Sequence, residues 1–151
     1  MNKKLFKTAR WIGLLIVIIS GLISIIATGG GGDGNGGSGS NFTLDISISL
    51  GSTYYSVGQS TLSFDGAIVA TNTNPSGSAF VGLDATVRSV KSGQHTIAIK
   101  IIKQTAYHQE YLAGGIIIDT DSVESILLET KTATLRTGES IVYQFNTKDL
   151  Q

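Results

Sequence analysis

The strongest constraint in this sequence is a period of two in its apolar residues. Residues 44–50 read LDISISL, so apolar and polar side chains alternate along the segment. The same alternation returns in 81–88 (VGLDATVR), 97–101 (IAIKI) and 141–146 (IVYQFN). A strand places successive side chains on opposite faces, whereas a helix requires apolar residues three and four apart. Residues 41–151 are therefore predicted to form an all-β domain whose strands each bury one face.

Turn-forming residues separate these strands at short intervals. Asp65-Gly66 follows an apolar run and is a two-residue hairpin signal. Gly, Pro, Asn, Asp and Ser also gather at 72–78, 91–93, 119–122 and 137–139. The spacing predicts an antiparallel β-sandwich of about seven to nine strands, with a small barrel as the structural alternative.

Two patches carry a family resemblance. Residues 90–97 (VKSGQHTI) resemble the entry to a strand in bacterial immunoglobulin-like sandwiches. Residues 133–140 (ATLRTGES), together with Tyr143 and Phe145, are similar to the final hairpin of such domains. The resemblance implies an immunoglobulin-like sandwich and, by analogy, a role in adhesion, spacing or assembly.

The first 28 residues have the layout of a targeting or membrane segment. Residues 1–10 carry four basic side chains and no acid, and 11–27 contain no charge. We therefore expect 1–28 to be a signal peptide or a membrane anchor helix, with the remainder exported to the cell envelope or secreted. These 17 uncharged residues reach about 25 Å as a helix, against about 30 Å of hydrocarbon core. Cleavage and retention both remain open, and retention would make the membrane a partner.

The leader also resembles that of a bacterial lipoprotein, with a basic start, an apolar run, small residues and a glycine-rich continuation. Such leaders place a lipidated cysteine after the small residues. Here residues 27–30 read ATGG and the chain has no cysteine, which removes the lipid anchor. Residues 29–40 (GGGGDGNGGSGS) are predicted to be a flexible linker that spans roughly 20 Å.

Tyrosine clusters are the candidate ligand site. Sugar sites on β-sandwiches typically use aromatic faces with polar neighbours, and two tyrosine clusters of this chain lie outside its clearest alternating runs. The weak candidates for glycan binding are Tyr54, Tyr55, Tyr107, His108 and Tyr111.

Acidic residues offer a second weak candidate. Asp119, Asp121 and Glu124 cluster at a predicted turn and could supply oxygen ligands to calcium. A solvated acidic turn is the simpler interpretation, and no cofactor is predicted. His95 lies in phase with Ile97, so we expect a packed ring whose nitrogens bond to a neighbouring turn.

Charge and motifs narrow the function. Beyond residue 10 the sequence contains seven basic and eleven acidic residues, so no basic stripe is available to bind nucleic acid. No glycine-x-serine-x-glycine elbow on a strand-to-helix turn is present. We expect a non-enzymatic, exported module for binding, adhesion or assembly with a protein or glycan partner. A glycan-binding module is the alternative, and a small hydrolase is a remote one.

Overall fold

The computed structural model describes residues 41–53, 56–73, 77–106 and 109–150. The predicted leader (1–28) and linker (29–40) lie outside the described residues. The same holds for four ligand candidates: Tyr54, Tyr55, Tyr107 and His108. Within the described residues, no helix is long and apolar enough to span a membrane.

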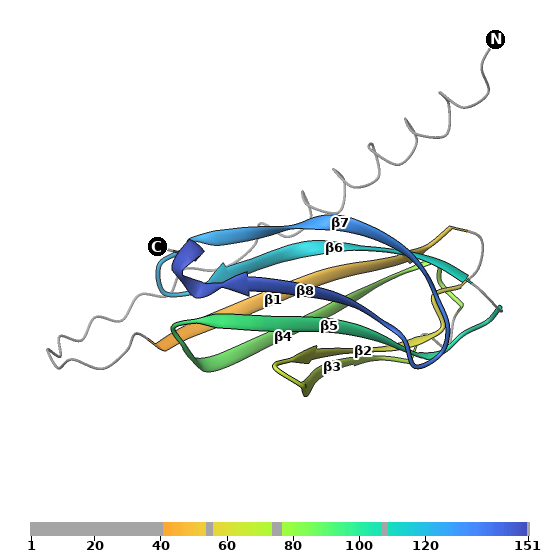
Figure 1. Cartoon of the computed structure of the whole chain (residues 1–151), viewed down its shortest axis with the longest axis horizontal. Coiled ribbons are helices and arrows are strands. Elements are labelled where there is room, and N and C mark those ends of the chain that lie inside the picture. Colours follow the sequence, from red (N-terminus) through yellow and green to blue (C-terminus); the bar gives the residue numbers. More distant parts are fainter. Residues whose placement is uncertain (1–40, 54–55, 74–76, 107–108, 151) are drawn as a thin grey trace, which may run out of the picture. The chain divides into compact units, whose positions relative to one another are not determined.

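Eight strands and one 3₁₀ turn make up this part of the chain (Figure 1). The elements are β1 (Asn41–Ser52), β2 (Gln59–Phe64), β3 (Ala67–Asn72), β4 (Phe80–Lys91), β5 (Gln94–Lys103), β6 (Gln109–Asp119), β7 (Ser125–Leu135), β8 (Ser140–Asn146) and η1 (Thr147–Leu150). The strand count confirms the predicted range and the all-β class.

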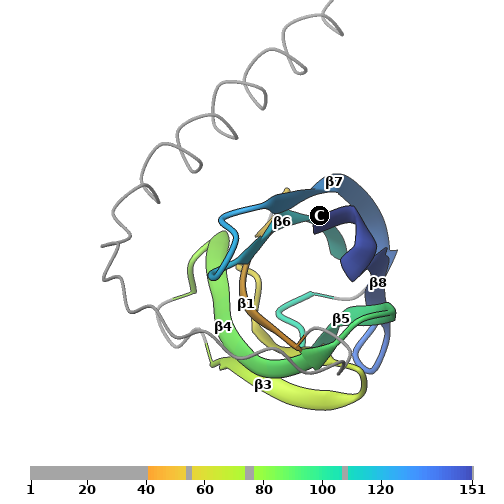
Figure 2. The same cartoon turned by 90° about the vertical axis from the view of Figure 1, so that its left-hand side faces the viewer.

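The strands form two antiparallel four-stranded sheets that enclose one core (Figure 2). Sheet A has the order β4-β1-β6-β7, and sheet B has the order β3-β2-β5-β8. The architecture is that of a β-sandwich, so the barrel alternative is not adopted. β3 and β4 are the edge strands on one side of the sandwich, and β7 and β8 are the edge strands on the other (Figure 2).

The alternating positions face the core as the sequence predicts. Every second residue of β1 is buried, and the matching positions of β5 and β8 face it from sheet B. The largest buried aliphatic side chains are Leu44, Ile46, Ile48, Leu50, Leu62, Leu83, Ile97, Ile99, Ile101, Ile117 and Leu150. The described core lies wholly between Phe42 and Leu150, and residues 38–151 form a compact unit of their own.

The hairpin predicted at Asp65-Gly66 is confirmed. It joins β2 to β3, and its two turn residues have φ values of 47° and 86°. Positive φ at both central positions matches the right-handed twist of the flanking strands.

The final hairpin predicted from 133–140 is wrong, because β7 belongs to sheet A and β8 to sheet B. The connection between them is held by β5 instead. Gly138 N donates to Ile101 O at 2.8 Å, and Ile101 N donates to Glu139 O at 3.0 Å. These bonds lead the chain across the end of the sandwich, so β8 continues along β5.

Three of the four edge strands contain a β-bulge. An extra residue interrupts β3 opposite Leu62–Ser63, β4 opposite Phe42–Leu44, and β7 opposite Ala113–Gly115. A bulge breaks the regular row of backbone donors and acceptors, which protects an edge from pairing with another strand.

Candidate functional site

The two sides of the sandwich differ in how they are closed. β3 and β4 lie side by side, although they belong to different sheets (Figure 2). Among the described residues, no backbone ladder joins them. We call this boundary the β3–β4 seam. Most of the partly buried apolar residues that pack on the core lie along it, namely Val69, Ala70, Val81, Ala85 and Val87.

The opposite boundary, the β7–β8 seam, is crossed by specific contacts. Lys131 of β7 donates from Nζ to Val142 O of β8 at 2.6 Å. The same ammonium lies 4.5 Å from the centre of the Tyr143 ring. Tyr143 donates its hydroxyl to Ala113 O of β6 at 2.7 Å, inside the core. These contacts join sheet B to sheet A.

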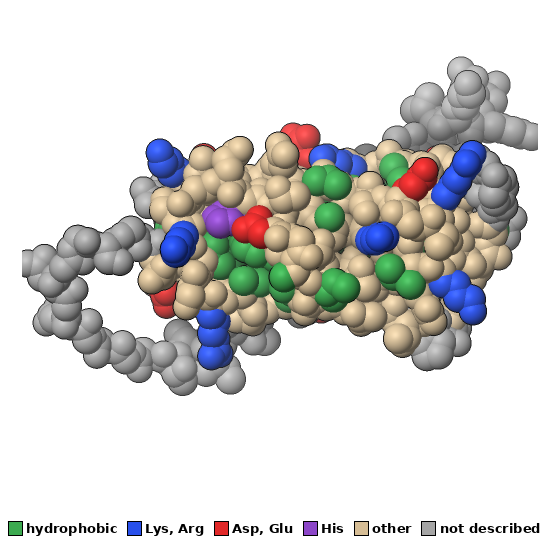
Figure 3. Space-filling view, turned by 60° about the horizontal axis from the view of Figure 1, so that its bottom comes forward, with side chains coloured by type: hydrophobic (Ala, Val, Ile, Leu, Met, Phe, Trp, Pro, Cys, Tyr) green, Lys and Arg blue, Asp and Glu red, His purple; other side chains and the backbone are tan. Residues whose placement is uncertain are grey.

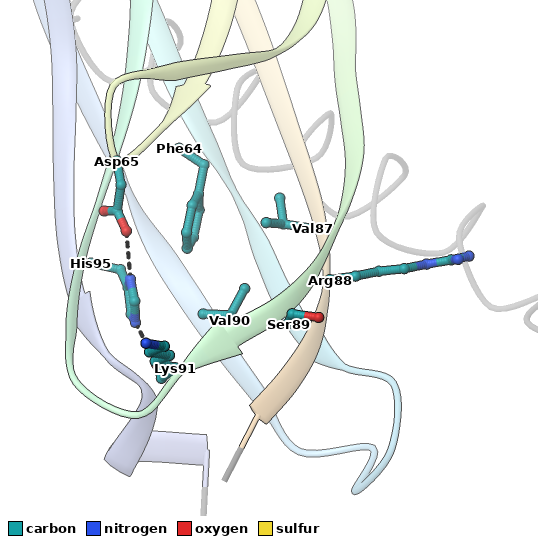
Figure 4. Close-up of a pocket in the computed structure, with 8 residues that line it drawn as sticks. All are labelled: Phe64, Asp65, Val87, Arg88, Ser89, Val90, Lys91 and His95. Carbon is teal, nitrogen blue, oxygen red and sulfur yellow. Dashed lines mark hydrogen bonds and ion pairs between the residues drawn. The ribbon is translucent and has the colours of Figure 1, made fainter. Parts of the chain in front are cut away.

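A hollow of about 370 Å³ opens at one end of the β3–β4 seam (Figure 4). It lies between the β2–β3 turn and the end of β4. Its lining residues are Phe64, Asp65, Val87, Arg88, Ser89, Val90, Lys91 and His95. Apolar side chains gather beside the histidine and an acidic residue on this face of the molecule (Figure 3).

The bulge of β4 produces the floor of this hollow. Val90 pairs with Phe42 and Val87 pairs with Leu44, so three steps along β4 match two steps along β1. Ser89 has a φ of 58°, a left-handed conformation that is uncommon outside glycine. The extra residue brings Val87 and Val90 to the core side of sheet A, although an unbroken strand would place them on opposite faces.

His95 fixes the wall of the hollow. Its Nδ1 lies 2.7 Å from Asp65 Oδ2, and its Nε2 lies 2.8 Å from Lys91 O. The other carboxylate oxygen of Asp65 accepts a hydrogen bond from Thr96 N at 2.8 Å. The ring therefore links the β2–β3 turn to the β4–β5 connection, which confirms the prediction of a packed histidine bonded to a neighbouring turn.

Aromatic packing holds the same ring in place. His95 stacks on Phe64 with the ring centres 5.1 Å apart and the planes 24° from parallel. Phe145 of β8 completes the cluster, with its ring centre 5.6 Å from that of His95 and 6.2 Å from that of Phe64. Because the imidazole is only 10% exposed, it serves as a wall of the hollow rather than as a projecting group.

This arrangement does not match a nucleophilic triad, although Ser89, His95 and Asp65 line one hollow. In a triad, the histidine nitrogen remote from the acid receives the proton of the serine. Here that nitrogen, Nε2, contacts the carbonyl oxygen of Lys91. Ser89 lies beyond Val90 from the ring, as Figure 4 shows.

Tyr111, the one ligand candidate within the described residues, is not at the surface. It belongs to β6, is 0% exposed, and donates its hydroxyl to Val57 O at 3.3 Å. Burial raises the pKa of the Tyr111 hydroxyl above its usual value, because the ionised form loses its hydration. The expectation that Tyr111 offers its face to a sugar is therefore wrong.

The acidic candidates do not assemble into a ligand set. Asp119 is 3% exposed, and its Oδ2 accepts the Ser122 hydroxyl at 2.6 Å. Both of its oxygens also receive backbone N–H groups of the β6–β7 turn at 3.3 Å. Asp121 and Glu124 are exposed on that turn. In the part of the chain that the structure describes, no three His, Cys, Asp or Glu side chains come together as a metal site.

Sequence reasoning did not select the residues of the hollow. The alternation in 81–88 predicts Val87 on the apolar face of a strand and Arg88 on the opposite face, and it does not indicate that either residue lies beside Phe64. One local signal was present: in Val87-Arg88-Ser89-Val90 the apolar spacing changes from two to three. Such a change indicates a bulge, but it does not reveal that β4 is an edge strand.

Comparison with protein-family models, with curated proteins and with solved structures gives no match to this chain. The functional argument therefore depends on the sequence and the structure of the chain itself.

Proposed function

We propose that this chain is an exported, non-enzymatic β-sandwich that binds another polypeptide at its β3–β4 seam. The observation that carries the proposal is the half-buried apolar surface along that seam. Apolar core residues stay half-exposed there, and the hollow opens at its end. A continuous apolar surface on a folded domain is typical of a contact site for another molecule.

The edges themselves favour binding through side chains over addition of a long strand. The bulges of β3 and β4 interrupt the backbone groups that an added strand would need. On the other side of the sandwich, Lys131 already occupies the carbonyl of Val142. A partner at the β3–β4 seam would therefore depend mainly on apolar contact and charge.

Three further observations support the class of function. Both nitrogens of His95 are engaged within the domain, which favours a structural over a catalytic role for this ring. The uncharged run at 11–27 behind a basic start supports export. The immunoglobulin-like assignment is part of the proposal, and residues 90–97 support it by forming the β4–β5 turn that their resemblance implies.

Position-specific photo-crosslinking in intact cells tests the proposal. The full-length chain would carry benzoyl-phenylalanine at Val87 in one version and at Val142 in another. Val142 is the matched control, because it is an exposed valine on the outer face of sheet B. We expect a discrete protein adduct from position 87 that position 142 does not form.

The same adduct from both positions, or none from position 87, would contradict a binding role for the seam. Export is tested separately by fusing alkaline phosphatase to the C-terminus, since this enzyme is active only outside the cytoplasm. Activity that persists after removal of residues 1–28 would overturn the assignment of the leader.

A further inference from the structure

The charges around the hollow indicate the chemistry of its partner. Arg88 and Lys91 stand at the rim, and neither forms an ion pair with any of the described residues. The only acid in the lining is Asp65. Its two oxygens are held by His95 and by the backbone of Thr96. The free charges at this site are therefore both positive.

This sign is opposite to that of the domain around it. Residues 41–150 contain ten acidic and seven basic side chains, so the domain carries a net negative charge. A local group of two unpaired cations in such a domain attracts an anionic partner and repels a cationic one. In Figure 4 the Arg88 side chain extends outward from the rim, so it would reach a group that projects beyond the hollow.

The floor of the hollow is apolar, so the partner must also supply an apolar group. Phe64, Val87 and Val90 form this floor, and no free polar group of His95 faces it, since both ring nitrogens are bonded. The volume of about 370 Å³ lies near the lower end for ligand sites. It suits one side chain with its neighbouring backbone. The half-buried residues of β3 and β4 continue the apolar surface beyond the hollow, which favours a ligand longer than the hollow itself.

We propose that the hollow takes an extended acidic peptide, which places an aliphatic side chain on Phe64, Val87 and Val90 and a carboxylate at Arg88 and Lys91. This inference rests on the proposed binding function of the seam and specifies its partner. The peptide binds through an anchoring side chain and an ion pair. The bulge at Ser89 limits regular strand pairing at this point.

Fluorescence anisotropy with three labelled peptides tests the chemistry. The protein is fragment 38–151, which encloses the whole described core. The probes are short peptides of alternating leucine and aspartate, leucine and lysine, and serine and aspartate. We expect the leucine–aspartate peptide to bind at least about tenfold more tightly than either of the others, because only it satisfies both floor and rim.

Charge reversal provides the decisive comparison. In the Arg88→Glu, Lys91→Glu double variant, affinity for the leucine–aspartate peptide should fall at least about tenfold. Affinity for the leucine–lysine peptide should rise. The matched control is Lys100→Glu, Lys103→Glu, which makes the same charge change at exposed lysines of β5 outside the lining. This control should keep the original preference. Circular dichroism confirms that each variant is folded.

Several outcomes would overturn the inference. These are equal binding of the leucine–aspartate and leucine–lysine peptides, equal loss in both double variants, or no binding of any peptide. Binding of a simple aliphatic carboxylate, measured by calorimetry and with no binding of any peptide, would identify a small-molecule site instead. Binding of phosphatidylglycerol vesicles that requires Arg88 and Lys91, again without peptide binding, would identify a lipid surface. A crosslinked adduct at position 87 with no acidic-peptide preference would reject this inference and leave the binding function standing.

Discussion

The two sheets are joined by different contacts at the β7–β8 seam and at the β3–β4 seam. Each is the place where the edges of two sheets meet around one core. At the β7–β8 seam, Lys131 and Tyr143 connect the sheets through hydrogen bonds to Val142 O and Ala113 O. At the β3–β4 seam the two strands lie close together, but among the described residues no backbone ladder joins them, and half-buried aliphatic residues lie along them. The comparison shows that one side of a sandwich can be closed by hydrogen bonds between its sheets and the other by apolar packing alone. We call the β7–β8 side the sealed seam and the β3–β4 side the open seam.

The largest expected effect is the loss of the Tyr143 side chain from the sealed seam. Tyr143→Ala should lower the free energy of unfolding by about 3–5 kcal/mol, because a large buried ring leaves a cavity. Val87→Ala in the open seam should cost only about 1 kcal/mol, since that side chain is half-exposed. Urea unfolding of both variants measures the contrast. Equal costs would mean that the two seams contribute alike.

Substitution of His95 tests how much the β3–β4 seam depends on the contacts that this ring makes at one end of it. His95→Ala is expected to lower the free energy of unfolding by about 2 kcal/mol, because it removes a packed ring and two hydrogen bonds. Amide hydrogen exchange should rise at the β2–β3 turn and at the β4–β5 connection, which the ring joins. Exchange that rises only at the β7–β8 seam would contradict this role.

The sealed seam should also make the domain sensitive to alkali. Burial raises the pKa of the Tyr143 hydroxyl in the folded state above its usual value. The stability that depends on the protonated hydroxyl is therefore complete below the unfolded pKa of about 10. It is lost as pH rises through the higher folded value.

Tyr143→Phe should cost about 1 kcal/mol at neutral pH by removing the bond to Ala113 O, and it should flatten the loss of stability at high pH. Unfolding followed by circular dichroism from pH 8 upward checks this, with tyrosinate absorbance as a second signal. A wild-type curve that does not fall at high pH would be inconsistent with the buried hydroxyl.

The smallest expected effect on stability comes from Lys131. Lys131→Met removes the contact with Val142 O and the cation over the Tyr143 ring, and should cost about 0.5–1 kcal/mol. The more informative readout is association, because the edge of β8 loses its covering charge. Sedimentation at increasing concentration should show self-association in the variant, whereas Lys100→Met should remain as the wild type.

The local alternation of apolar and polar residues predicted most of the fold. In 44–50 one buried face leaves a strict alternation of apolar residues in the sequence, so strands and their inward positions were readable. The pattern was weaker at β6, where Gln109 takes an inward position. Its amide donates to Ser52 Oγ at 2.7 Å and to Ser56 O at 2.6 Å. Because a polar residue stands at an inward position, the alternation of apolar residues does not show which face of β6 is buried. The sequence therefore placed the buried Tyr111 among the surface aromatic residues.

The hollow depends on information that no short segment contains. Val87 and Val90 line it because β4 is an edge strand, which within the described residues pairs with β1 and with no other strand. The same limit explains the wrong hairpin at 133–140. The turn residues were recognised correctly, but bonds to Ile101, more than thirty residues away, decide which sheet receives β8.

The place of β1 in sheet A has a mechanical consequence. This strand begins at Asn41, the first described residue, and is paired along its length with β4 and with β6. The hydrogen bonds of both ladders run across the strand direction. Tension applied at Asn41 along β1 would therefore load both ladders in shear, so many bonds must fail together instead of one after another. A domain pulled from this end would resist force through its most fully paired strand.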